Sequence, residues 1–330
     1  MSGVLVVVEY RNGAITRSSL EALAAGQSLA KQLGTDCCAA ILGEGIASLA
    51  EELSGKHLAK VYAVEHPLLQ QYTADGTTIA LQQLVEKLAP AYVLFPHTYQ
   101  VRDFAPALAT RFGQVLISDV IAIHPDPEGG PTFVRQLFQG KLNADYRPAA
   151  PPAPCFVSIQ AGAFRADSLE SAAPPAPIES FSPSIEPAQI RTTPSAPFRE
   201  AAHTVDLTAA PVIVSVGRGI REQENIALVQ TLADALGAEL AASRPICDAG
   251  WLPMERQVGS SGQTVSPKLY LAIGISGAIQ HLVGMKGSIT VIAINKDENA
   301  PIFEVADYGV AADLFEIVPA LTKAVLAAKG

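Results

Sequence analysis

The sequence predicts an α/β protein with two domains that have parallel-type sheets. Short apolar runs rich in valine and isoleucine alternate with amphipathic stretches of about 10–15 residues, which is typical of strands alternating with helices. The length of 330 residues exceeds the usual size of one domain, roughly 100–200 residues. Apolar residues form 49% of the chain and charged residues 17%, enough to build packed cores and too apolar for a mainly disordered chain.

The first half of the chain repeats a strand-then-helix pattern. The valine-rich segment 4–10 reads as a buried strand, and the helical pattern after it places apolar residues on one side, at Leu20, Leu23, Leu29 and Leu33. Further strands are expected at 37–42, 61–65, 91–96 and 115–123, and helices at 44–55, 76–89 and 100–113. This order predicts βαβ units on a parallel sheet.

Prolines dominate the segment from Pro148 to Pro197. Proline removes a backbone donor and fixes φ, so this region is expected to be extended, an edge strand or a linker rather than helical. The segment IESFSP from Ile178 remains a candidate strand of the first domain. The change in composition favours a boundary near Arg199 to Asp206, which gives domains 1–203 and 204–330.

The second half restarts the same pattern. Segment 211–217 reads as a buried strand and 223–236 as a helix. Further strands are expected at 238–245, 270–275 and 290–296, with a closing helix at 313–328. The sequence therefore predicts a doubly wound C-terminal domain.

Composition excludes several classes of function. There are 23 Lys and Arg against 32 Asp and Glu, a net charge of −9, and no basic run, so nucleic acid is not an expected partner. No apolar stretch reaches the ~20 residues of a membrane span, and no signal-peptide pattern precedes the first strand, so a cytoplasmic protein is expected. The cysteines show no metal-binding spacing and are expected to be reduced and structural: Cys37, Cys38, Cys155 and Cys247.

Candidate binding residues follow three predicted strands of the second half. In an open parallel sheet, ligands bind at the carboxyl ends of strands. The strand ends are Gly217-Arg218-Gly219, the segment 276–281 and the segment 295–297. Small residues allow close backbone approach, Arg218 supplies a cation, and a helix start at Ser276–Gly277 would offer N–H groups. The pattern predicts a rim that binds phosphate and sugar.

Each of these motifs also has a plain structural interpretation. Glu222 stands where a dinucleotide fingerprint has its third glycine, so Gly217-x-Gly219 alone fits an ordinary turn, and Ser276 alone fits a helix cap. Arg244 could stack on a planar ring or be a solvated surface residue. The loop 257–263 could bind a heteroaromatic edge or be a mobile surface loop, and a lone His281 is more often structural. Recurrence at three successive strand ends favours a ligand site.

The motifs from Ser243 onward carry a specific resemblance. They are SRPICDAGW, QVGSSG, GISGAIQHL, INKD, APIF and VADYG, in this order and spacing. In the first half, PHTYQVRDFAPALATRFG and LISDVIAI agree with the same family. The chain thus resembles the α subunit of electron transfer flavoprotein, most densely from about Ser243 to the C-terminus.

The resemblance implies a redox function. It implies one FAD in the C-terminal domain and a heterodimer with a β subunit that holds AMP. It also implies electron transfer from acyl-CoA or related dehydrogenases, as in fatty acid β-oxidation, to a membrane quinone oxidoreductase. Such outer-sphere transfer needs no acid/base residue, and none is expected here.

The resemblance assigns part of the site to the adenosine diphosphate portion of FAD. The residues implied for that portion are Arg218 and the turn formed by Ser276, Gly277, Ala278 and Ile279. Asn295, Asp313 and Leu314 are implied for the adenosine end.

The resemblance assigns the rest of the site to the flavin. Ser243 and Arg244 would lie at the isoalloxazine, and Ser261, a threonine in many relatives, near N5. Gln280 and His281 would approach the ribityl chain and the C2 carbonyl. The other implied cofactor-binding residues belong to one loop: Gln257, Val258, Gly259 and Ser260.

Two alternatives stay open. A bifurcating relative would carry a second FAD in its β subunit instead of AMP, and the α chain alone discriminates poorly between the two types. A non-redox nucleotide-binding or scaffold protein could reuse the fold, although Arg244, Ser261, Gln280 and His281 argue against it. A proline-containing hinge near 199–206 would let the FAD domain swing between partners.

Overall fold

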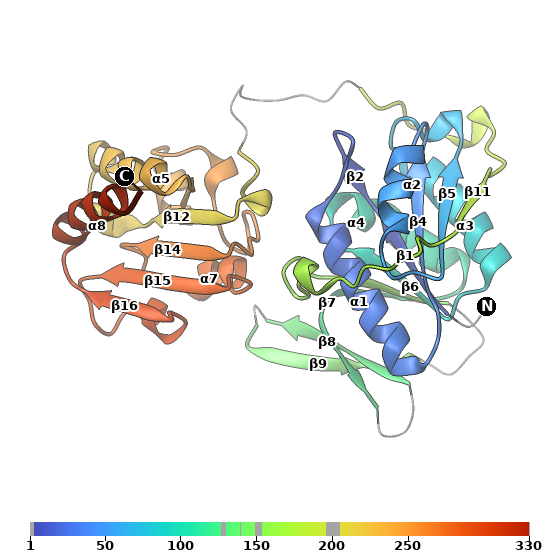
Figure 1. The fold of residues 1–330 in the computed structure, drawn as a ribbon, viewed down its shortest axis with the longest axis horizontal. Coiled ribbons are helices and arrows are strands. Elements are labelled where there is room, and N and C mark those ends of the chain that lie inside the picture. The colour runs from blue at the N-terminus through green and yellow to red at the C-terminus, as the bar shows by residue number, and fades with distance from the viewer. Residues whose placement is uncertain (1–2, 127–129, 139, 149–153, 196–204, 330) are drawn as a thin grey trace. The chain divides into compact units, whose positions relative to one another are not determined.

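The computed structural model describes residues 3–126, 130–138, 140–148, 154–195 and 205–329. The chain divides into two compact units, Met1–Pro197 and Phe198–Gly330 (Figure 1). The boundary predicted between 203 and 204 lies outside the described residues, as does most of the predicted hinge 199–206.

The first unit is built on a nine-stranded sheet with the order β11-β5-β4-β1-β6-β10-β7-β8-β9. Its strands are β1 (Val4–Val8), β4 (Cys37–Gly43), β5 (Lys60–Glu65), β6 (Tyr92–Pro96), β7 (Leu116–Pro125), β8 (Pro131–Leu137), β9 (Leu142–Tyr146), β10 (Cys155–Ile159) and β11 (Ile178–Phe181). The short strands β2 (Tyr10–Arg11) and β3 (Ala14–Ile15) form a separate antiparallel pair.

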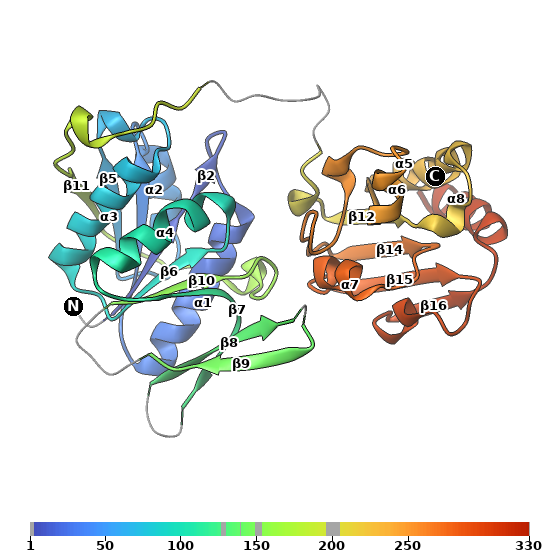
Figure 2. The same cartoon turned by 180° about the vertical axis from the view of Figure 1, so that it is seen from behind.

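Helices cover both faces of this sheet. Helices α1 (Arg17–Leu33) and α2 (Ala47–Ser54) pack on one face, and α3 (Ala74–Leu88) and α4 (Tyr99–Arg111) on the other, as the view from behind shows (Figure 2). Strand β1 contributes Val6 to the first face and Leu5 to the second because successive side chains alternate. Both layers are therefore buried, which explains why the strands read as continuous apolar runs.

Threonines begin three of these helices. The Oγ1 atoms of Thr16, Thr73 and Thr98 each accept a hydrogen bond from the backbone N–H three residues on, at the starts of α1, α3 and α4. Such a cap satisfies one of the N–H groups that a helix start leaves without a partner. Short 3₁₀ turns complete the unit at Pro67–Leu69, Ala166–Ser168 and Pro187–Gln189.

The predicted α/β class is confirmed, with two corrections in the first unit. The sheet is mixed, because β8 pairs antiparallel with both β7 and β9, whereas the sequence predicted parallel-type sheets. Strand β10 lies inside the sheet, parallel to β6 and β7, and not at an edge or in a linker. The first group of prolines ends at Pro154 and none lies within 155–159, so every residue of β10 keeps its N–H donor. Segment 178–181 does form the edge strand β11.

The second unit is a five-stranded, fully parallel sheet with the order β13-β12-β14-β15-β16. Its strands are β12 (Val212–Val216), β13 (Glu239–Ala242), β14 (Leu269–Ile273), β15 (Thr290–Asn295) and β16 (Tyr308–Ala311). The chain passes from β12 to β13 on one side and then returns to β14 on the other. This reversal makes the unit doubly wound, with its switch point between β12 and β14.

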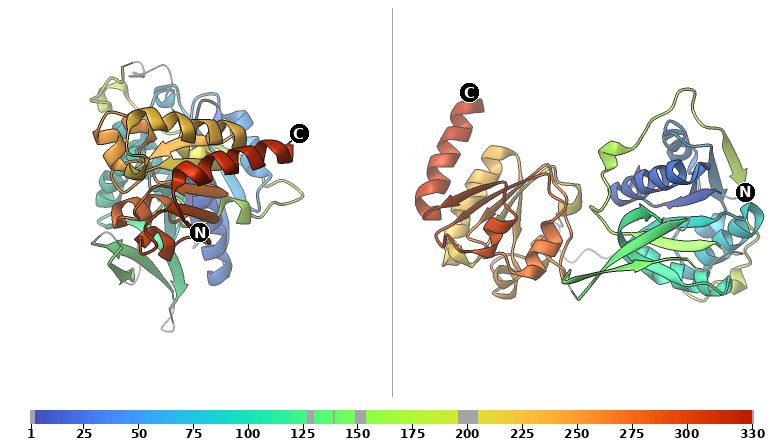
Figure 3. Two further views of the ribbon diagram at one scale, coloured as in Figure 1. Left: turned by 90° about the vertical axis from the view of Figure 1, so that its left-hand side faces the viewer. Right: turned by 90° about the horizontal axis from the view of Figure 1, so that it is seen from below.

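Helices cover both faces here too. Helices α5 (Ile226–Leu236) and α8 (Leu314–Lys329) pack side by side on one face (Figure 3), while α7 (Ile279–Met285) lies on the other. The short helix α6 (Arg244–Asp248) follows β13. Short 3₁₀ turns occur at Leu207–Ala209, Arg218–Ile220, Gln223–Asn225, Met254–Arg256 and Pro301–Glu304. Among the described residues, no helix has both the length and the apolar character to cross a membrane.

Glu9 is a partly buried carboxyl group at the carboxyl end of β1. The Thr98 hydroxyl donates a hydrogen bond to its Oε1 at 2.8 Å. Burial raises the pKa of Glu9 from 4.5 to about 7, and the Thr98 hydrogen bond and the Arg11 charge oppose this only in part. The folded state therefore holds the Glu9 proton more tightly than the unfolded state does.

We expect the first unit to lose stability as pH rises through about 7. A raised folded-state pKa contributes stability that is complete below the ordinary value of 4.5 and is lost as the folded carboxyl ionises. The loss should be about 1–3 kcal/mol. Glu9→Gln should remove this pH-dependent loss of stability, because glutamine does not ionise and its amide oxygen can still accept the hydrogen bond from Thr98. Hydrogen exchange of β1 amides against pH measures the effect.

The second unit supplies the control for this experiment. The chain has one tryptophan, and Trp251 packs against the core of the second unit, so its fluorescence follows the unfolding of that unit. The substitution should leave the fluorescence transition unchanged. If the stability measured from β1 amide exchange changes equally with pH in the wild type and in Glu9→Gln, Glu9 is not the group responsible.

Candidate cofactor site

The candidate site lies along the carboxyl edge of the second unit's sheet. Arg218 follows β12, Ser243 and Arg244 follow β13, and Ser276 follows β14. Asn295 is the last residue of β15. Because all five strands are parallel, their carboxyl ends meet at one edge of the sheet. The structure thus brings together the segments that the sequence predicted as a rim.

Glycines let the loops after β12 and β14 touch. The Gly219 N–H donates to the Gly274 carbonyl at 3.0 Å, and a Cβ added at Gly217 would lie 2.4 Å from the same oxygen. Gly274 itself has φ of 64°, a left-handed conformation that favours glycine. The contact leaves Arg218 and Ser276 exposed at the switch point.

The turn after β14 corrects one prediction. Helix α7 begins at Ile279, and not at Ser276–Gly277, because Gly277 has φ of 88°, outside the helical region. A Cβ at Gly277 would lie 2.2 Å from the backbone nitrogen of Ile302. Ala278, Ile279 and Gln280 are exposed along this turn, whereas Gly277 is buried.

Arg218 and Arg244 supply positive charge at the edge. Arg244 begins α6, so the strand predicted at 238–245 ends earlier, at Ala242. The Arg244 side chain is 65% exposed, and its Nε lies 3.1 Å from Oδ2 of Asp248. The neighbouring Ser243 is buried. Arg218 is exposed and forms no ion pair with any described residue. Both cations can therefore meet an anionic ligand.

The loop 257–263 is fixed against its neighbours. The Val258 N–H donates to the Ala242 carbonyl at 2.9 Å, and the Ser260 N–H donates to the Gln280 carbonyl at 2.8 Å. A Cβ at Gly284 would lie 2.3 Å from the nitrogen of Gly259, so α7 and the loop are in backbone contact. These contacts tie the loop to the end of β13 and to α7.

Gln257 and Ser261 form a pair within this loop. Gln257 is buried, and its Nε2 lies 2.9 Å from the exposed Ser261 Oγ. Its Oε1 is buried and has no hydrogen-bond partner among the described residues. With the amide in this orientation the Ser261 oxygen accepts, so the hydroxyl proton is directed elsewhere.

His281 lies beneath the edge rather than on it. Only 5% of the residue is exposed, and its Nε2 lies 2.9 Å from the hydroxyl oxygen of Tyr270. Burial lowers the pKa of His281 to about 4, although the Val258 backbone opposes this. The imidazole is therefore neutral at pH 7 and contributes no charge to the site.

The residues implied for the adenosine end divide into surface and core. The Asn295 Nδ2 donates to the Ile275 carbonyl at 2.9 Å, which holds the loop after β14. Asp313 accepts from the Phe315 N–H at 2.9 Å and lies 3.2 Å from the Arg221 guanidinium. Leu314 is buried. It therefore supports the loops rather than presenting a polar group.

Three residues near the site were missed by sequence reasoning. Arg221 lies over the Phe315 ring at 4.9 Å from its centroid, Gly274 makes the loop contact, and Tyr270 meets His281. The spacing Gly274-x-x-Gly277 was a usable signal for a tight turn. No sequence signal predicted the contact between Tyr270 and His281, because it joins a strand to a helix and the sequence does not fix the rotation of that helix.

A Ser–His–Asp grouping in the first unit is structural. His97 Nδ1 lies 2.9 Å from Ser158 Oγ, and its Nε2 lies 3.8 Å from Asp119 Oδ1. Ser158 is completely buried, and its Oγ also accepts from the Asp119 N–H. A nucleophile must reach its substrate, so this grouping cannot act as a hydrolytic triad.

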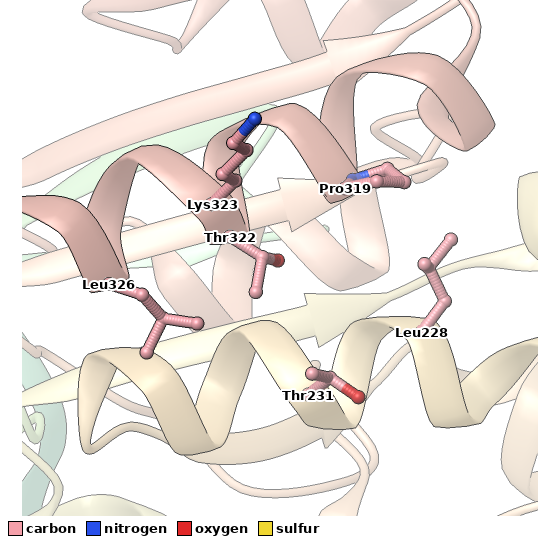
Figure 4. Close-up of a pocket in the computed structure, with 6 residues that line it drawn as sticks. All are labelled: Leu228, Thr231, Pro319, Thr322, Lys323 and Leu326. Atoms are coloured by element: carbon pink, nitrogen blue, oxygen red, sulfur yellow. The ribbon is translucent and has the colours of Figure 1, made fainter.

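A groove of about 340 Å³ lies elsewhere in the second unit, between α5 and α8 (Figure 4). Its lining is mostly apolar, with one ammonium group from Lys323. None of the predicted site residues lines it.

The polar groups at the edge fit a flavin nucleotide. Two buried polar atoms, Gln257 Oε1 and His281 Nδ1, have no hydrogen-bond partner among the described residues. Buried polar atoms normally find partners, so a ligand with matching groups would stabilise both. Exposed Arg218 and Arg244 supply charge for phosphates and an electron-rich ring, and the glycine turns let a ligand approach the backbone.

The fold and site define a two-unit α/β protein with a polar edge of the kind that binds nucleotide cofactors. Residues 4–186 match the family described as "Electron transfer flavoprotein domain", and residues 206–286 match "Electron transfer flavoprotein FAD-binding domain". The electron transfer flavoprotein subunit alpha of Bacillus subtilis is 38% identical over 320 residues, covering 97% of this chain and 96% of that protein. The chain belongs to the electron transfer flavoprotein α subunit family, whose function is electron transfer.

Two further relatives extend the comparison. Electron transfer flavoprotein subunit alpha of Mycobacterium leprae is 38% identical over 334 residues and covers both chains completely. A protein of Anaerotignum propionicum, named "Acryloyl-CoA reductase electron transfer subunit beta", is 34% identical over 354 residues, covering 98% of this chain and 95% of that protein.

We expect Gly277→Ala to destabilise the second unit by about 2 kcal/mol or more. A methyl group there combines left-handed backbone strain with a clash against the Ile302 backbone. Urea unfolding followed by Trp251 fluorescence measures the change.

Gly250→Ala is the matched control. Gly250 also has a positive φ, of 72°, but a Cβ there would meet nothing within 4 Å. It should carry the backbone cost alone, about 1 kcal/mol. Equal losses for the two variants would show that the contact with Ile302 adds nothing.

Proposed function

We propose that the chain binds one FAD along the carboxyl edge of its second unit and passes electrons through it. The observation that carries this proposal is that the family match and the polar features of the site fall on the same residues. The match to the FAD-binding domain family covers residues 206–286, and the same residues contribute the cations, the glycine turns and the two buried polar atoms without partners. The proposed domains are 1–203, for partner contact and scaffold, and 204–330, for FAD.

The site residues act by binding and by electrostatics. Bound FAD would supply the redox chemistry. Arg218 and the turn of Ser276, Gly277, Ala278 and Ile279 are proposed to hold the phosphates, and Asn295 and Asp313 the adenosine. Arg244 is proposed to lie against the flavin, where a cation favours an electron-rich ring. Because His281 is neutral, it can offer a hydrogen bond but no charge.

The proposed assembly is a heterodimer. The partner is an electron transfer flavoprotein β subunit that holds AMP, and the first unit of this chain would contribute its contact surface. Electrons would come from acyl-CoA or related dehydrogenases, as in fatty acid β-oxidation, and leave to a membrane quinone oxidoreductase. Family membership over nearly the full length supports the β-subunit partner.

One relative favours a second candidate. The printed name of the Anaerotignum propionicum protein associates it with an acryloyl-CoA reductase, which consumes electrons rather than supplying them. A related role here would deliver electrons to an acyl-CoA-type reductase, including the bifurcating arrangement with a second FAD in the β subunit.

Cofactor content of the purified heterodimer tests these proposals. One FAD per heterodimer, with AMP, supports the ordinary carrier, and two FAD molecules support the bifurcating form. A colourless heterodimer without flavin would overturn both and favour a scaffold. The measurement needs an absorbance spectrum and nucleotide analysis of the complex after co-expression.

Arg244→Ala should lower the reduction potential of the bound flavin. Loss of a cation beside an electron-rich ring removes stabilisation of the reduced form, at about 30–60 mV for each ~1.4 kcal/mol. Spectroelectrochemistry of the heterodimer measures it.

Lys268→Ala is the matched control, because it removes the same charge just before β14, at the opposite edge of the sheet. Its potential should equal that of the wild type. Equal potentials in Arg244→Ala and wild type would remove Arg244 from the flavin.

A further inference from the structure

Tyr270 and His281 form a buried pair beneath the candidate site. Tyr270 is the second residue of β14 and is completely buried, and His281 is in the first turn of α7. The hydroxyl oxygen of Tyr270 lies 2.9 Å from Nε2 of His281, with the rings at 61°. The contact joins the sheet to the helix that carries the exposed edge residues.

The ionisation of the two groups limits which way their hydrogen bond runs. Burial raises the pKa of Tyr270 far above its ordinary value, so the phenol keeps its proton. The imidazole is neutral, so one of its nitrogens is a donor and the other an acceptor. Either Tyr270 donates to Nε2, or Nε2 carries the proton and Tyr270 accepts.

The groups around the pair favour donation by Tyr270. The hydrogen bond of good geometry that the Tyr270 hydroxyl makes among the described residues is the one with Nε2 of His281. If this completely buried phenol accepted from Nε2, its own proton would be left without an acceptor, which is costly in a protein interior. Tyr270 therefore donates to Nε2, and the proton of the neutral ring lies on Nδ1, which has no hydrogen-bond partner among the described residues.

The other possible acceptor for Tyr270 is Ser215 on β12. Ser215 is buried on the same side of the sheet, and its side chain lowers the pKa of Tyr270 against the larger effect of burial. Its Oγ makes no hydrogen bond of good geometry with the described residues. Nε2 of His281, at 2.9 Å, is thus the better-placed acceptor for the phenol proton.

We propose that Tyr270 is a positioning residue: it donates to Nε2 of His281, fixes the neutral Nδ1–H tautomer, and so leaves the ring one N–H donor for the site. The pair also sets the rotation of α7 beneath Gln280 and the loop 257–263. Toward a ligand, His281 then offers only a donor, which matches a carbonyl and not an N–H group. The role of His281 toward a ligand rests on the proposed FAD site, whereas the assignment of the tautomer does not depend on that site.

Nitrogen NMR of histidine-labelled full-length chain, purified as the heterodimer, tests the tautomer directly. His281→Asn identifies its signals by their loss. In the wild type, His281 should show a protonated Nδ1 and an unprotonated Nε2 at pH 7. Tyr270→Phe should lose this single-tautomer signature and show both tautomers in exchange. A protonated Nε2 in the wild type, or an unchanged single Nδ1–H tautomer in Tyr270→Phe, would overturn the proposal.

Tyr62→Phe is the matched control. Tyr62 is a buried tyrosine in the first unit, so its substitution carries the general cost of removing a buried hydroxyl without touching His281. It should leave the His281 signals unchanged. If Tyr270→Phe does not fold, the wild-type spectrum alone still decides between the two hydrogen-bond directions.

Flavin binding is the second readout. Tyr270→Phe should weaken FAD binding by about fivefold, equivalent to one hydrogen bond, while Tyr62→Phe should not change it. If the wild-type complex binds no FAD, the proposed function fails while the tautomer result stands. If FAD binds and the tautomer is not Nδ1–H, the positioning role fails alone.

Discussion

The backbones that leave β12 and β14 come closer together than any side chain would permit. Gly217, Gly219 and Gly274 make this possible, and the hydrogen bond from the Gly219 N–H to the Gly274 carbonyl fixes it. The rest of the candidate site depends on this contact. It lies at the switch point of the sheet, where loops from neighbouring strands diverge to opposite faces and leave an edge that a ligand can reach.

Much of this arrangement could be predicted from the sequence, because strand order and strand ends follow from apolar runs. Arg218, Arg244 and Asn295 were placed at the edge by counting from the ends of predicted strands, and the structure places them there. What could not be predicted depends on contacts between elements. The rotation of α7 buries His281 against Tyr270, and nothing in a helical segment of seven residues specifies that rotation.

The errors in the first unit have a similar cause. Strand β9 is largely exposed and polar, so it lacks the apolar pattern that identifies a strand, and the antiparallel extension was missed. Strand β10 was taken for edge or linker because of the prolines before it. A proline affects the ladder only where its own N–H is required, and β10 begins after the last one. Local composition predicted extended backbone in this region but not the place of the strand in the sheet.

The two apolar layers of the second unit are complete without the edge residues. Residues such as Val214 and Ile273 close one layer, and Tyr270 and Met285 the other, while Arg218, Arg244 and Ser261 stand on loops outside both. Changes in those loops can therefore accumulate with little effect on folding. Closely similar chains could diverge in redox potential or in direction of electron flow by exchanging a few loop residues. The tolerance ends at the glycines, where any side chain would force the two loops apart.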